Sequence, residues 1–86
     1  MTSQESSLNN RRDKLLTSLG KHIQELREAQ GLSQVDLAGK MIGKFDTTNI
    51  SRIESGRTNP TIFTLYRISE ALEIPLQELL SFEIEN

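Results

Sequence analysis

Apolar residues recur at the spacing of an amphipathic helix along most of the chain. The first such stretch begins near Arg11 and places these residues on one face: Leu15, Leu19, Ile23 and Leu26, with Leu16 beside them. A second stretch, within residues 33–42, carries Val35, Leu37, Ala38, Met41 and Ile42. The later stretches carry Ile50 and Ile53, then Ile62, Leu65, Tyr66, Ile68, Ala71 and Leu72, and finally the short segment 76–80. No stretch has a clear strand pattern, so the sequence predicts an all-α protein of five helices.

Residues that begin or end helices stand at the borders of these stretches. Ser33 and Asp36 have the S-x-x-D spacing of a capping box, and Gly43 can end that helix in a left-handed conformation. Asp46 is a suitable N-cap for the next helix, which Gly56 ends. The borders of the last two helices are marked by Pro60, Thr61 and Pro75.

The 86 residues are enough for one domain with a modest core. We expect residues 1–9, which are polar, to be a flexible N-terminal segment, residues 10–82 to form the domain, and residues 83–86 to be a short C-terminal tail. Gly20 interrupts the first predicted helix. It either weakens that helix by ~1 kcal/mol relative to alanine or marks a break between an N-terminal arm and the helix proper.

The composition excludes several classes of protein. An apolar fraction of 35% and a charged fraction of 26% are typical of a globular chain. Because there is no cysteine and His22 is the single histidine, we expect neither a disulfide framework nor a metal site, and no cofactor. The first residues lack the apolar region of a secretory signal, and no apolar run approaches the ~20 residues of a membrane span. We therefore expect a cytoplasmic protein without a membrane partner.

The net charge of −2 is unevenly distributed. Residues 9–60 carry nine Lys and Arg against six Asp and Glu, which leaves +3, whereas residues 61–86 carry Arg67 against five Glu, which leaves −4. A basic part and an acidic far end orient a molecule towards a polyanion. Ordinary mixed surface charge is the alternative explanation.

The central stretch, residues 31–57, predicts two short helices joined by a turn. With Ile50 and Ile53 facing inward, the second of these helices presents Thr47, Thr48, Asn49 and Arg52 outward. Short hydrogen-bonding side chains and a guanidinium near one helix N-terminus are suited to the base edges of a DNA major groove. For Thr47 and Thr48, a role as simple helix-start residues is the alternative.

The phrases IQELREAQGLSQVDLA, NISRIESGRTNPT and ALEIPLQELL, in this order, resemble the lambda-repressor-like DNA-binding domain, the Cro-type or XRE helix-turn-helix. The resemblance covers residues 19–80 and implies a compact five-helix fold with the helix-turn-helix at helices 2 and 3. It implies a recognition helix over residues 47–55 that enters the major groove. From Ala38 to Ile50 the chain has two residues more than the usual family spacing, and we expect the longer turn to lift Lys44 towards a phosphate.

The resemblance also implies individual roles. Gln34 would contact phosphate and sometimes a base, and Arg57 would bind phosphate from the loop after the recognition helix. Asn59 would do the same, or would only shape the turn before Pro60. Thr47, Thr48 and Arg52 would contact base edges, and Asn49 a base or the backbone. Arg27 and Glu54 would form a structural ion pair.

These features favour a sequence-specific transcriptional regulator, most simply a repressor that binds a two-fold operator as a homodimer. The alternative is an antitoxin or another protein-interaction module with the same fold, and catalysis has no support. One recognition helix contacts only about four base pairs, too few to define one site in a genome. We expect the dimer contact in the fifth helix and tail, through Leu76, Leu79, Leu80, Phe82 and Ile84, unless Leu79 and Leu80 simply close the monomer core.

Overall fold

The computed structural model describes residues 3–85, which contain only helices and connecting segments. The helices are α1 (Ser3–Ala29), α2 (Gln34–Lys40), α3 (Thr47–Glu54), α4 (Ile62–Leu72) and α5 (Leu76–Leu79). The prediction of an all-α chain with five helices is confirmed. Within this part of the chain, no helix is both long and apolar enough to cross a membrane.

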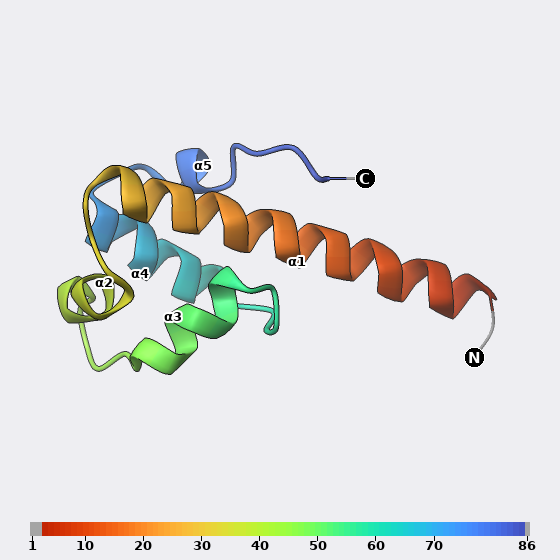
Figure 1. Cartoon of the computed structure of the whole chain (residues 1–86), viewed down its shortest axis with the longest axis horizontal. Helices are drawn as coiled ribbons and strands as arrows, with labels where there is room; N and C mark the ends of the chain where they lie inside the picture. Colours follow the sequence, from red (N-terminus) through yellow and green to blue (C-terminus); the bar gives the residue numbers. More distant parts are fainter. Residues whose placement is uncertain (1–2, 86) are drawn as a thin grey trace.

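The helices pack around the C-terminal half of α1 (Figure 1). α3 and α5 contact α1, α2 lies against α3 and α4, and α4 packs on α5. The side chains that meet between them and are almost completely buried include Ile23, Leu37, Ile50, Ile68, Leu72 and Leu79. The N-terminal half of α1 projects beyond this core, so the molecule measures 42 Å along its long axis against 23 Å and 19 Å along the others.

Three helices start at the residues that the sequence marks as caps. In α2, the N–H of Asp36 donates to Ser33 Oγ at 3.0 Å and the N–H of Ser33 donates to Asp36 Oδ2 at 2.9 Å. The hydrogen bond from the Ser33 N–H, followed by the Ser33 side chain, holds the pKa of Asp36 below its usual value, because both favour the carboxylate. Asp46 accepts a hydrogen bond from the Thr48 N–H at 3.1 Å, and the hydroxyl of Thr61 caps α4 in the same way.

The first helix begins earlier than predicted. Residues 3–9 are helical, so the expectation of an unordered segment is wrong for them, and residues 1–2 lie outside the described part of the chain. No proline or glycine interrupts residues 3–19, and Glu5 places a negative charge in the first turn, where the helix dipole favours it. Since the side chains of this arm lie mostly in solvent, no apolar pattern reveals the helix. The domain boundaries themselves stay a prediction.

Gly20 marks the place where the end of α3 reaches α1. A Cβ atom at this position would collide with the backbone carbonyl oxygens of Ile53 and Glu54. α1 continues through Gly20, so a break at this point is excluded, and the glycine permits the close approach of two backbones. Gly56, which follows α3 at φ +75°, approaches Thr17 of α1, and a Cβ there would lie 2.9 Å from the Thr17 backbone.

α2 is shorter than predicted, because it ends at Lys40. Met41 has an extended backbone, with φ −75° and ψ 138°, and its side chain is buried in the core, whereas Ile42 is 73% exposed. The helical spacing of Met41 and Ile42 therefore does not reflect a helix. Gly43, with φ +79°, carries the chain on towards Asp46, and residues 41–46 form a bent, irregular connection in place of a tight turn.

α5 closes the core on the side of α1 away from α3 (Figure 1). Leu79 is fully buried there, so the expectation that it contacts a partner is wrong, because the monomer itself covers this side chain. Leu76 and Phe82 are half-buried and pack against the same core. Leu80 and Ile84 remain 41% and 52% exposed.

The segment from Glu78 of α5 to Glu85 of the tail contacts α1 at several points. The ring of Phe82 lies against His22, with 5.7 Å between ring centroids, and His22 Nε2 donates to the Glu78 carbonyl oxygen at 2.9 Å. The N–H of Glu85 donates to Ser18 Oγ at 2.9 Å, and the Glu85 carboxylate pairs with an exposed lysine of α1 at 3.0 Å. Residue 86 of the predicted tail lies outside the described residues.

Gly20→Ala is expected to destabilise the protein by roughly 1–3 kcal/mol, because the new methyl group collides with the α3 backbone. Gly39, in α2, is the matched control, since a Cβ there has no neighbour within 4 Å. Gly39→Ala should stabilise by up to about 1 kcal/mol through helix propensity alone. Urea unfolding of both variants measures the difference, and equal gains in stability would contradict the close approach of α3 to α1.

Candidate nucleic-acid interface

A buried ion pair between α1 and α3 lies beneath the candidate site. Arg27 Nε donates to Glu54 Oε2 at 2.6 Å and Arg27 Nη2 donates to Glu54 Oε1 at 2.9 Å, in a two-pronged contact. The two side chains are only 8% and 4% exposed. The hydrogen bond to Glu54 raises the pKa of Arg27 further above its ordinary value. Since Arg27 Nη1 also donates to the Leu32 carbonyl oxygen at 2.6 Å, one side chain fixes α3 and the start of α2 to α1.

Gln34 joins this ion pair from α2. Its Nε2 donates to Glu54 Oε1 at 2.9 Å, and its side chain is half-buried. The amide nitrogen is therefore engaged within the protein. The amide has a second N–H, so its bond to Glu54 does not exclude the phosphate contact that the resemblance implies. In this structure Gln34 links α2 to α3.

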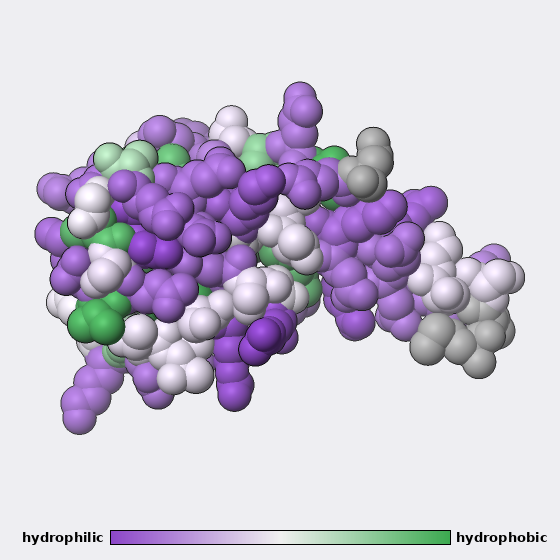
Figure 2. Space-filling view, viewed as in Figure 1, coloured by the Kyte–Doolittle hydropathy of each residue, from purple (hydrophilic) through white to green (hydrophobic). Residues whose placement is uncertain are grey.

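α3 presents a polar edge to solvent. Its inward side chains are Ile50, Ile53 and Glu54, its exposed ones are Thr48, Asn49, Ser51 and Arg52, and Thr47 is half-buried. The predicted base-contacting residues thus lie on one surface. Figure 2 shows the surface over α3 mostly white and purple, with little green, as expected for hydroxyl and charged groups. Ser51 was missed by the sequence analysis, although its helical spacing from Thr47 and Thr48 places it on the same edge.

Cationic and amide groups lie at both ends of this edge. Lys44 precedes α3, Arg57 and Asn59 follow it, and all three are exposed. Within residues 3–85, Lys44, Arg52 and Arg57 form no salt bridge, so their charges are available to a ligand. In this arrangement hydrogen-bonding side chains lie between cations. It suits a polyanion that also presents hydrogen-bond donors and acceptors on its surface.

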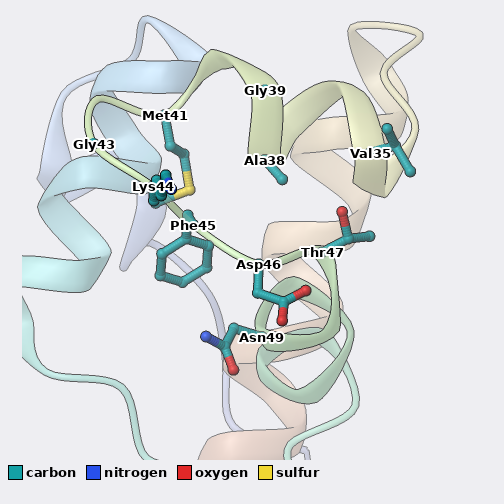
Figure 3. Close-up of a pocket in the computed structure, with 10 residues that line it drawn as sticks. All are labelled: Val35, Ala38, Gly39, Met41, Gly43, Lys44, Phe45, Asp46, Thr47 and Asn49. Carbon is teal, nitrogen blue, oxygen red and sulfur yellow. The ribbon is translucent and has the colours of Figure 1, made fainter.

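A groove of about 760 Å³ separates α2 from the start of α3 (Figure 3). Its walls are formed by Val35, Ala38, Gly39, Met41, Gly43, Lys44, Phe45, Asp46, Thr47 and Asn49. The groove therefore brings residues of α2 onto the same surface as the first turn of α3. Residues 43–46, which belong to the long connection between the two helices, complete the lining of the groove.

Arg67 of α4, which the sequence analysis did not single out, holds this connection in place. Its Nη2 donates to the Ile42 carbonyl oxygen at 2.8 Å and to the Lys44 carbonyl oxygen at 3.4 Å. The guanidinium carbon also lies 5.1 Å from the centre of the Phe45 ring, a cation–π contact. The sequence does contain a signal, because Arg67 is the single cation among residues 61–86. Arg67 positions the segment that leads into α3.

Comparison with known proteins identifies relatives of this chain. The family model described as "Helix-turn-helix" matches residues 23–79. An uncharacterized HTH-type transcriptional regulator, y4dJ of Sinorhizobium fredii, is 33% identical over 63 residues, which are 73% of this chain and 79% of that protein.

Two solved structures have a similar fold. The restriction-modification controller protein C.AhdI from Aeromonas hydrophila is 34% identical with a TM-score of 0.69, and the match covers 74% of this chain and 94% of that chain. An HTH_3 family transcriptional regulator from Vibrio cholerae is 27% identical with a TM-score of 0.71, over 80% of this chain and 38% of that chain.

Glu54→Ala is expected to lower the free energy of unfolding by ~3–5 kcal/mol, because it leaves the buried guanidinium of Arg27 without its partner. Glu28→Ala is the control. Glu28 is an exposed carboxylate on the same helix as Arg27, and its loss should change stability by less than about 1 kcal/mol. Thermal melts of the two variants decide the matter, and small, equal shifts would contradict the structural importance of the pair.

Proposed function

Because the chain belongs to the helix-turn-helix family of DNA-binding transcriptional regulators, we propose that α3 and its cap, residues 47–55, enter the major groove and bind a specific sequence. The observation that carries the proposal is the polar edge of α3, held outward by the buried pair of Arg27 and Glu54. The major groove admits an α-helix, and a helix that packs on the protein with one face and exposes hydrogen-bonding side chains on the other can contact the base edges there.

The exposed side chains divide into two groups by their chemistry. Arg52 contacts guanine, since a guanidinium can donate to O6 and N7 together, and Thr47, Thr48 and Asn49 contact base edges or the adjacent backbone. Lys44, at the other end of the helix from Arg52, neutralises a phosphate. In the loop after α3, Arg57 and Asn59 bind the phosphate backbone, where side chains fix the register of the protein without selecting a sequence.

We propose further that the protein is a repressor that occupies a two-fold operator as a homodimer. A surface for the second copy lies where the tail meets the projecting part of α1. Leu8, Leu15 and Ile84 line a hollow of about 490 Å³ there, and they are 67%, 41% and 52% exposed. Leu80 adds a further exposed apolar side chain on the tail side. This surface keeps Leu80 and Ile84 of the expected contact and replaces the buried Leu79 with residues of α1.

A second candidate function, a protein-interaction module such as an antitoxin, is favoured by one observation. α4 begins with Ile62 and Phe63, which are 62% and 66% exposed, and Tyr66 one turn later is 46% exposed. Large apolar side chains gathered on one helix are typical of a protein-binding surface. If binding of a protein partner is the main function, substitution of Arg52 leaves that function intact.

Arg52→Ala is expected to weaken binding to the specific site by ~1–3 kcal/mol, mainly through lost discrimination at one base pair. Arg57→Ala is the matched comparison, and it should weaken binding to all sequences. The slope of log K against the logarithm of the salt concentration should become smaller by about one. Titrations of the selected site and of single-base variants at several salt concentrations measure both effects. If Arg52→Ala weakens all sequences equally, Arg52 contacts phosphate and the assignment to a base is wrong.

Ile84→Asp is expected to turn the dimer into a monomer, because it buries a charge at the contact between copies. Ile62→Asp is the control, since Ile62 is similarly exposed but lies on α4. Both side chains are more than half exposed in the monomer, so each variant should melt like the wild type at a dilution at which the wild type is monomeric. Sedimentation gives the oligomeric state. A monomer only with Ile62→Asp would place the contact on α4, and a wild-type protein that stays monomeric at high concentration would exclude the dimer.

A further inference from the structure

Val35 is an apolar side chain that its own chain does not cover. It lies in the first turn of α2 and is 66% exposed, whereas Leu37, two residues later on the same helix, is fully buried. Single exposed valines are common on protein surfaces and need no explanation by themselves. The position of Val35 distinguishes it, because it lies in the groove between α2 and α3, beside the edge that faces DNA in the proposed function.

The surroundings of Val35 in this groove are small and apolar. Figure 3 shows Val35 and Ala38 on α2, with Thr47, the first residue of α3, opposite them. Gly39 continues the same wall, and the space around it is open, since a Cβ there would meet nothing within 4 Å. The two methyl groups of Val35, the methyl of Ala38 and the methyl of Thr47 therefore border a hollow that remains accessible from the DNA side.

Among the groups that bases present in the major groove, the C5-methyl of thymine is the apolar one. Val35 has no hydrogen-bonding group, so it cannot select a base through a donor or acceptor. It can select one by burying a methyl group. We propose that Val35 and the methyl of Thr47 form a subsite for a thymine methyl group, and that α2 thereby contributes to sequence selection.

This inference rests on the proposed function and specifies one base that it recognises. Thr47 of α3 has a hydroxyl as well as a methyl, whereas Val35 of α2 has methyl groups alone. Thr47 can accept or donate a hydrogen bond at the base edge while its methyl and Val35 cover the thymine methyl. Cytosine at the same position lacks the methyl group and leaves the hollow unfilled.

The test replaces each thymine of the selected operator, one at a time, by deoxyuridine, which pairs with adenine but lacks the methyl group. For the wild-type protein we expect the affinity to fall about three- to fivefold at one position in each half-site, as for exposing one buried methyl. For Val35→Ala the same replacement should change the affinity by less than about 1.5-fold, since the methyl has lost its cover. Ile42→Ala is the control: Ile42 is exposed at 73%, is not part of the groove wall, and its variant should respond as the wild type does.

Several outcomes would overturn the inference. If Val35→Ala weakens binding to thymine and deoxyuridine sites equally, Val35 contacts the sugar-phosphate backbone. If Val35→Ala leaves binding to every site unchanged, Val35 is outside the interface or serves a protein partner. In both cases Arg52→Ala still reduces discrimination, so the proposed function survives. If no specific site can be selected for the wild-type protein, the proposed function fails and the subsite fails with it.

Discussion

The contact between Arg27 and Glu54 is the constraint on which the arrangement of the helices depends. Removing both charges from water is unfavourable, and it is tolerated because two hydrogen bonds between them, one to the Leu32 carbonyl and one from Gln34 satisfy the polar groups. These bonds join α1, α2 and α3 at one point and so fix the rotation of α3 about its axis. With Glu54 fixed inward, helical geometry turns Arg52 and Thr48 outward.

The connection between α2 and α3 is fixed from the opposite direction. Arg67 of α4 binds the Ile42 and Lys44 carbonyl oxygens and covers the Phe45 ring, so a segment longer than a tight turn still delivers Asp46 to the start of α3. The two arginines thus hold the two ends of α3. At the C-terminal end of α3, the glycines of the α1–α3 contact allow the helix to lie close to α1 while its polar edge stays free.

The elements of the fold that depend on local chemistry were predictable from the sequence. The caps at Ser33 and Asp46 were predicted because their side chains bond to the next turn of the same helix. Features that depend on distant contacts were not predictable. α2 ends before Met41 because the core takes this side chain from an extended backbone, and Gly20 is required by the α3 backbone rather than by α1 itself. Leu79, expected in a dimer contact, is buried by α1 and α4, which the local sequence does not reveal.

The central claim is that the outward edge of α3 contacts bases in the major groove, and methylation interference with dimethyl sulfate on the selected operator tests it most directly. The reagent methylates guanine at N7, which lies in the major groove, and adenine at N3, which lies in the minor groove. We predict that methylation of a guanine in each half-site prevents binding and that the Arg52→Ala protein no longer responds to that guanine. Interference confined to adenines, or no interference within the protected half-sites, would contradict placement of α3 in the major groove.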